Sequence, residues 1–171
     1  MKIQQKIYYV TYQSFPAETA NSLQTISNIK YLIKNGVDVE LIFPLRENNS
    51  KASIQKIKKH YSIKEDFKVT GVNHFLPFGH IKILEGFFFH ISHFLWSYFV
   101  VTFKIKKTDG ENFITRSDWI LYFLARKGCK VLFECHQTSK IRTIIINRLK
   151  SYQNVKFIFL NEHLQDYYKM D

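Results

Sequence analysis

The chain is short of cysteine, and the two that it has are badly placed for pairing. Only Cys129 and Cys135 occur among the 171 residues. If residues 130–136 form one strand, a rise of roughly 3.3 Å per residue puts the two Cα atoms about 20 Å apart, whereas a disulfide allows about 7 Å. The polar opening residues 1–6 also show no secretory signal. We therefore expect two free thiols and a cytoplasmic protein.

Several motifs that mark common functions are missing. No P-loop, GxGxxG or GxSxG motif occurs, so the sequence lacks the signatures of P-loop NTPases, dinucleotide-binding enzymes and α/β-hydrolases. The RNP, KH and zinc-finger patterns of nucleic-acid-binding modules are absent too. His90 and His93 have helical i, i+3 spacing, but no third ligand matches them. We predict no metal site and no cofactor.

Positive charge is what the chain has in excess. It carries 25 Lys+Arg against 14 Asp+Glu, a formal net charge of +11. Such a balance speaks for anionic partners, with nucleic acid, an anionic membrane surface and phosphate-bearing ligands all open. The hydrophobic fraction of 46% is sufficient for a packed core, and the length suits one domain.

Hydrophobic patterns predict strands that alternate with helices. The predicted strands are 6–12, 37–43, 67–72, 112–115, 131–135 and 156–160, and the predicted helices are 19–35, 50–60, 81–105, 117–127, 139–151 and one from about 162. We expect Pro44 to end the second strand. Continuous apolar strands joined by helices are typical of a parallel sheet buried on both faces. The prediction is an α/β fold, a Rossmann-like parallel sheet with helices on both faces, and a ligand site at the carboxyl ends of the strands.

Motifs at these strand ends resemble one enzyme family. The segment FPAETANS at 15–22 opens the first helix, which ends at Asn35-Gly36; ITRS at 114–117, VLFECHQTS at 131–139 and FIFLNEHLQDYY at 157–168 follow in order. This order and spacing resembles the N-terminal domain of glycosyltransferase family 4, whose fold is GT-B. The resemblance covers residues 6–44 and 112–168. Two features differ from many members: the loop YQSFPAET has no glycine pair, and the fourth strand ends in Thr115-Arg116 rather than a histidine.

The resemblance implies what the domain does. Residues 1–171 would form a single acceptor-side domain, the N-terminal half of a GT-B architecture, with the donor-binding domain outside this chain. A retaining enzyme of this kind transfers sugar from a nucleotide-sugar, held mainly by the other domain, to a polysaccharide or lipid-linked acceptor. We accordingly expect the chain to be inactive without a donor domain, which a separate polypeptide could supply.

Five residues are candidates for the site. By the resemblance, Glu18 and Asn21 face the cleft and bind acceptor hydroxyls, although both also suit the first turn of a helix. Arg116 is placed to bind a phosphate, or else is a solvated residue before a helix. Glu134 and His136 alternate along one strand and so share a face. Glu134 needs a partner there, and His136 is the catalytic candidate that orients an acceptor hydroxyl or takes its proton, unless backbone groups satisfy it.

The aromatic stretch 86–103 has no formal charge and is followed by Lys104, Lys106 and Lys107. Three interpretations stay open: a membrane span, an interfacial helix that docks 86–107 on an anionic membrane surface, and a core helix packed on the sheet. The second would make the protein peripheral on the cytoplasmic face of the membrane.

Two other functions compete with the glycosyltransferase hypothesis. The first is a non-catalytic remnant or partner subunit that keeps the fold without the activity. The second is a basic nucleic-acid-binding module, which the net charge suggests but the missing motifs do not support.

Overall fold

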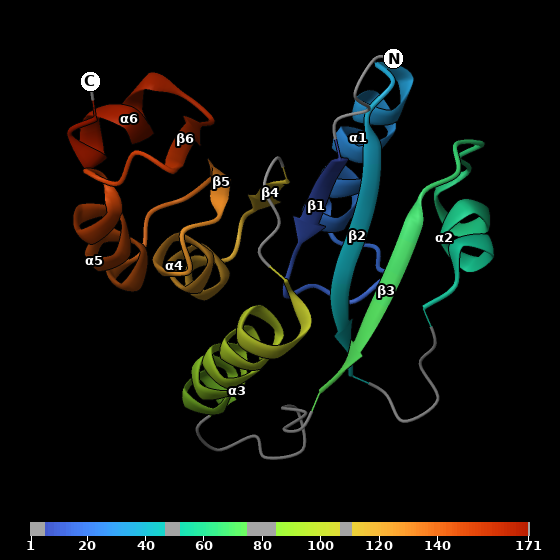
Figure 1. Ribbon diagram of the computed structural model, residues 1–171, viewed down its shortest axis with the longest axis horizontal. Coiled ribbons are helices and arrows are strands. Elements are labelled where there is room, and N and C mark those ends of the chain that lie inside the picture. The colour runs from blue at the N-terminus through green and yellow to red at the C-terminus, as the bar shows by residue number, and fades with distance from the viewer. Residues whose placement is uncertain (1–5, 47–51, 75–84, 107–110, 171) are drawn as a thin grey trace.

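The computed structural model describes residues 6–46, 52–74, 85–106 and 111–170. Six parallel strands form one sheet in the order β3-β2-β1-β4-β5-β6 (Figure 1). The strands are β1 Lys6–Val10, β2 Asp38–Leu45, β3 Lys68–Asn73, β4 Asn112–Thr115, β5 Lys130–Cys135 and β6 Val155–Phe159. The α-helices are α1 Ala20–Lys34, α2 Ile54–Tyr61, α3 Glu85–Phe99, α4 Asp118–Arg126, α5 Lys140–Leu149 and α6 Glu162–Tyr168, and a π-helical turn, Val100–Lys104, extends α3. The predicted α/β, Rossmann-like fold is confirmed.

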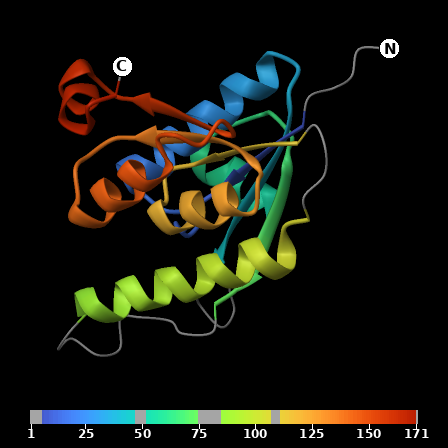
Figure 2. The same ribbon diagram turned by 60° about the vertical axis from the view of Figure 1, so that its left-hand side comes forward.

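Helices cover the sheet on both faces, as alternating strands and helices predict. One core lies between the sheet and α1 and α2, around Tyr9, Ile29 and Phe43. The larger core lies on the opposite face, under α3, α4, α5 and α6. Figure 2 shows the sheet between these two layers, with α3 running along the lower side of the molecule beneath α4.

Glycine follows two helices where the predicted helices 19–35 and 117–127 end. Gly36 follows α1 with φ +78°, and Gly128 follows α4 with φ +77°. This left-handed backbone is strained for other residues and closes a helix before a tight return to the next strand. Cys129 and Cys135 form no disulfide, as expected, and both are buried.

The expectation that Pro44 ends the second strand is wrong. β2 runs to Leu45, and Pro44 lies opposite Val72 of β3. The carbonyl of Ile42 accepts a hydrogen bond from the Thr11 amide at 3.0 Å, so the nitrogen of residue 44 faces the same side. β1 has already ended at Val10, and the N–H that proline lacks has no strand to bond there.

The aromatic stretch forms α3 and its π-helical turn; the predicted residues 81–84 lie outside the described ranges. One face packs into the larger core through Trp96, which is 1% exposed, with Val100 and Val101. The Trp96 indole N–H also points at the Val72 carbonyl, at 3.4 Å. By length and composition alone, Gly86–Lys104 is also apolar enough to cross a membrane.

We expect Trp96→Ala to show how strongly α3 belongs to the folded domain. Emptying this buried site should lower the free energy of unfolding by about 3–5 kcal/mol, as for other buried aromatic residues. Tyr98→Ala, on the exposed face of the same helix, should cost less than about 1 kcal/mol. Urea denaturation followed by circular dichroism measures both; equal costs would contradict the packing of α3 on the sheet.

Candidate functional site

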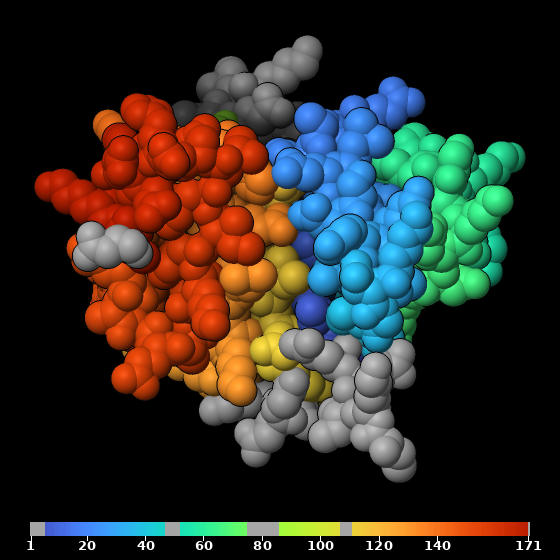
Figure 3. Space-filling view, turned by 90° about the horizontal axis from the view of Figure 1, so that it is seen from above, coloured from blue at the N-terminus to red at the C-terminus, as the bar shows by residue number. Residues whose placement is uncertain are grey.

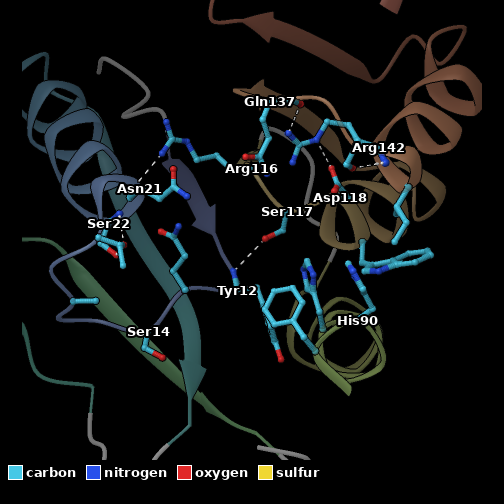
Figure 4. Close-up of a pocket in the computed structure, with 18 of the residues that line it drawn as sticks. Tyr12, Ser14, Asn21, Ser22, His90, Arg116, Ser117, Asp118, Gln137 and Arg142 are labelled. Atoms are coloured by element: carbon cyan, nitrogen blue, oxygen red, sulfur yellow. Dashed lines mark hydrogen bonds and ion pairs between the residues drawn. The ribbon is translucent and has the colours of Figure 1, made fainter. Parts of the chain in front are cut away.

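A cavity of about 720 Å³ lies at the carboxyl ends of the two central strands. From β1 the chain continues through α1 to β2, whereas from β4 it continues through α4 to β5, so the two paths diverge in opposite directions. Open parallel sheets hold their ligands at such a switch point. Figure 4 shows the cavity with residues from the loop after β1 and from α1, α3, α4 and α5 around it.

Three helix N-termini border the cavity. Its lining includes Thr19 and Ser22 of α1, Ser117 and Asp118 of α4, and Ser139 to Arg142 of α5. The side chains of Thr19 and Ser139 accept hydrogen bonds from their own first turns, as N-caps do. Ser117 instead accepts from the Tyr12 amide at 3.2 Å, which ties the two diverging paths together. The positive ends of the three helix dipoles favour a negatively charged ligand.

Arg116 joins the two halves of the sheet beside the cavity. Its Nε donates to Glu134 Oε2 at 2.8 Å, its Nη1 donates to the Asn21 carbonyl at 3.2 Å, and its Nη2 lies 2.6 Å from His136 Nε2. The Arg116 and Glu134 side chains are only 8% and 12% exposed. A guanidinium only donates, so His136 Nε2 is the acceptor in this contact.

Glu134 has the partners that a carboxylate inside a sheet needs. Besides Arg116, it accepts from the Tyr9 hydroxyl at 2.9 Å and from the Asn28 amide at 2.9 Å. Burial, together with the carboxylate, raises the pKa of Tyr9, which therefore stays a donor. Burial and then Arg116 lower the pKa of His136, against the opposing effect of Glu134, so the imidazole is neutral at pH 7.

A second ion pair holds the opposite wall. Arg142 Nε donates to Asp118 Oδ1 at 2.6 Å, and its Nη1 donates to the Gln137 carbonyl at 2.7 Å. Burial raises the pKa of Asp118 while Arg142 opposes this change. The pair fixes the first turn of α4 against that of α5.

The wall formed by α3 is aromatic. The rings of Tyr12 and His93 stack with centroids 4.2 Å apart. The Arg46 guanidinium lies 4.3 Å from the centre of the Tyr12 ring and donates a hydrogen bond to the Tyr12 carbonyl. The Tyr12 hydroxyl lies 2.6 Å from His74 Nε2 and 3.1 Å from Ser92 Oγ. These contacts fix the Tyr12 side chain between the loop after β1 and α3, where it forms part of the cavity wall.

His93 Nε2 and Gln13 Oε1 are buried atoms of the lining that have no hydrogen-bond partner among the described residues. Burial lowers the pKa of His93 to about 3, so its ring is neutral. An unpaired polar atom in a buried position is costly unless a ligand or water satisfies it. These two atoms are therefore candidate contacts for a ligand.

The structure brings together four of the five predicted site residues. Asn21 and Arg116 line the cavity, and Glu134 and His136 line an adjoining hollow of about 120 Å³ that Asn21 and Arg116 also reach. Glu18 is exposed just before the N-cap of α1 and lines neither space. The catalytic role of His136 stays a prediction.

Sequence reasoning missed several residues of this site. Tyr12, Arg46 and Asp118 fall within strand-end segments, and the topology alone would have included them. Arg142 lies in the first turn of α5, where the sequence alone predicts a solvent-exposed arginine. The spacing of His93 from His90 suggested only a metal ligand, and its position within an aromatic helix suits a core residue equally well.

The cavity offers positive charge with little to oppose it. Arg46, Arg116, Lys140 and Arg142 line it, whereas Asp118 is the one carboxylate among the described residues of the lining, and it pairs with Arg142. Over the described ranges, no three His, Cys, Asp or Glu residues are grouped to hold a metal ion. The arrangement suits an anionic group that also presents hydroxyls.

A second hollow of about 640 Å³ lies at the amino ends of the strands, between α1 and the β4–β6 half of the sheet (Figure 3). Ile7, Ile114 and Leu132 form much of its surface, with Lys130 and Lys156 at the amino ends of β5 and β6. The described residues around it include neither a helix N-terminus nor a buried arginine, so the cavity at the carboxyl ends is the stronger candidate.

The neutral state of His93 predicts a pH-dependent stability. The unfolded chain protonates this histidine near its ordinary pKa of 6.5, and the folded chain does so only near about 3. The stabilisation is thus complete above pH 6.5 and is lost as the pH falls from there toward 3. Between pH 7 and 5, His93 alone should remove about 2 kcal/mol from the free energy of unfolding.

His93→Phe keeps a ring against Tyr12 but cannot titrate. Between pH 7 and 5, its free energy of unfolding should therefore fall by about 2 kcal/mol less than that of the parent protein. Urea denaturation at both pH values measures the difference. Phe89→Leu, which also alters packing against Tyr12, is the control. It should lower the free energy of unfolding, relative to the parent protein, by the same amount at pH 7 and at pH 5. An unchanged pH dependence in His93→Phe would count against a buried, neutral His93.

Comparisons with known proteins give no further assignment. No protein-family model, curated protein or solved structure matches the chain. What the site does must therefore be argued from its own geometry.

Proposed function

We propose that this chain is the acceptor-side, N-terminal domain of a GT-B glycosyltransferase that resembles family 4, and that the cavity binds a sugar or lipid-linked acceptor carrying a phosphate. The observation that carries the proposal is the switch-point cavity, bordered by the N-termini of α1, α4 and α5. Its volume of about 720 Å³ is within the range of small-molecule sites.

The positive wall supports binding of a phosphate group. Lys140 and the first turns of α4 and α5 provide charge and N–H groups on one side, and Arg116 provides a guanidinium on the other. Arg116 and Arg142 are held in place by Glu134 and Asp118, so little side-chain freedom is lost when a ligand binds. A rigid guanidinium also matches the geometry of phosphate oxygens.

The neutral polar atoms support binding of sugar hydroxyls. His93 Nε2 and Gln13 Oε1 lie buried in the lining without partners, and a hydroxyl can satisfy either one. Trp119, which lines the cavity and is partly exposed, offers an aromatic surface for the apolar face of a sugar ring. A ligand with hydroxyls and a phosphate uses all of these features together.

The loop after β1 speaks against a dinucleotide. Sites for a pyrophosphate at the first helix need glycines, because only they let the ligand approach the backbone closely. Here the loop contains Tyr12, Gln13 and Phe15, with Tyr12 and Phe15 buried. The proposal therefore leaves the nucleotide part of the donor to the other domain.

His136 has a role in this proposal that depends on Arg116. His136 Nε2 now accepts from Arg116 Nη2. When the ligand anion takes that donor, the neutral imidazole is released to orient an acceptor hydroxyl and accept its proton during transfer. Glu134 then acts as a positioning residue for both side chains.

We expect hexose 1-phosphates to bind the chain more tightly than free hexoses or inorganic phosphate do. In a titration followed by NMR, the ligand should change the backbone amide chemical shifts of Thr19, Ser22, Ser117 and Ser139. Lys140→Gln should weaken binding about tenfold, as expected for one hydrogen bond to a charged group. Lys150→Gln, at the other end of α5, is the matched control and should bind as the parent does.

Two results would contradict the proposal. One is a set of ligand-induced shifts centred on Gln153 and Lys156 at the second hollow rather than at the three N-termini. The other is micromolar binding or turnover of a nucleotide-sugar by this chain alone, since donor recognition is assigned to a different domain.

A further inference from the structure

We propose that α3 and α4 form a docking surface for an anionic lipid bilayer, with aromatic side chains entering the interface and lysines meeting the headgroups. The proposal concerns the outer surface of α3 and does not rest on the ligand that the cavity binds.

The outward face of α3 exposes large apolar side chains in a stripe. Phe87, Leu95, Tyr98 and Phe103 are 60%, 42%, 46% and 65% exposed, while Trp96 on the other side is buried. Leu95 follows Phe87 by eight residues and Tyr98 follows Leu95 by three, which puts these side chains on one side of the helix. The Phe103 ring lies 6.3 Å from the Tyr98 ring. A run of exposed aromatics on one helix is far from the scattered single residues that soluble surfaces tolerate.

The surface continues onto α4. Phe94 contacts Trp119 and Phe123 with ring centroids 4.9 and 5.3 Å apart, and Tyr98 contacts Phe123 at 5.5 Å. Tryptophan and tyrosine are the residues that favour the boundary between headgroups and acyl chains. The rings of five residues are thus in contact across the two helices: Phe94, Tyr98, Phe103, Trp119 and Phe123. Together with the exposed Phe87 and Leu95 they are named here the α3–α4 patch.

The charge around the patch selects an anionic partner. No Asp or Glu occurs in residues 86–106, whereas Lys104 and Lys106 are exposed at the end of the helix and Arg126 is exposed at the end of α4. Lys104 Nζ lies 5.6 Å from the centre of the Phe99 ring, so charge and aromatic surface meet directly. Lys107, which the sequence adds to this cluster, lies outside the described residues. Basic residues at the edge of an apolar face are typical of helices that bind anionic lipids.

The same helix borders the cavity on its inner side. Phe89, His90 and His93 of α3 line the cavity together with Trp119 of α4, so the α3–α4 patch reaches the edge of the cavity. A bilayer in contact with the patch would therefore lie next to the cavity wall. A ligand anchored in that bilayer would have a short path to the site.

Co-sedimentation with vesicles tests the docking surface. The chain should bind vesicles of phosphatidylcholine mixed with phosphatidylglycerol at low salt, and bind phosphatidylcholine alone far less. Leu95→Ser and Phe103→Ser should each weaken binding about tenfold, through lost apolar burial. Lys104→Gln and Lys106→Gln should each weaken it about fivefold and reduce its salt dependence.

The controls are exposed apolar residues elsewhere. Tyr31 on α1 and Ile144 on α5 are 69% and 66% exposed, and serine at either position should leave vesicle binding unchanged. Thermal unfolding of every variant shows that the fold is intact. The chain has two tryptophans, of which Trp96 is buried, so brominated lipids should quench Trp119, and Trp119→Phe should abolish that quenching.

Three results would overturn the proposal. The first is no binding to anionic vesicles at low salt. The second is equal loss of binding in the Tyr31→Ser control. The third is a dimer in light scattering that Leu95→Ser dissociates without any vesicle binding, which would assign the patch to a contact between proteins.

Discussion

The pairing of Arg116 with Glu134 is the interaction on which the site depends. The carboxylate lies on β5 and the guanidinium follows β4, and through Tyr9, Asn28 and the Asn21 carbonyl the same pair reaches β1 and α1. Both side chains are largely buried, so each charge requires the other: removing one partner of such a pair usually costs about 3–5 kcal/mol. These contacts fix the position of the N-terminus of α1 relative to β4 and β5, and so they maintain the shape of the cavity.

Most of the fold could be predicted from the sequence because burial on both faces leaves a strong pattern. The predicted bounds of β4, Asn112–Thr115, are those observed, and the predicted helices 19–35 and 117–127 end next to the glycines that close α1 and α4. The prediction that Pro44 ends the second strand is wrong because of a tertiary contact that the local sequence does not show. Whether a proline fits a strand depends on which neighbour its missing N–H would have faced, and β1 ends just before that point.

The site was less predictable, since its residues come from distant parts of the chain. Arg116, Glu134 and His136 follow strand ends that a parallel sheet brings together, so the topology was sufficient to group them. Glu18 belonged to the same loop as Asn21, yet it points to solvent, which no pattern could show. His93 became part of the cavity only through the way α3 crosses below the strands, and that packing has no local signal.

A crystal structure of this chain soaked with a hexose 1-phosphate shows whether the cavity is the ligand site. We predict the phosphate between Arg116 and the first turns of α4 and α5, with sugar hydroxyls within hydrogen-bond distance of His93 Nε2 and Gln13 Oε1. A ligand bound in the hollow at the amino ends of the strands, or an empty cavity whose Arg116 still contacts His136 at saturating ligand, would contradict it.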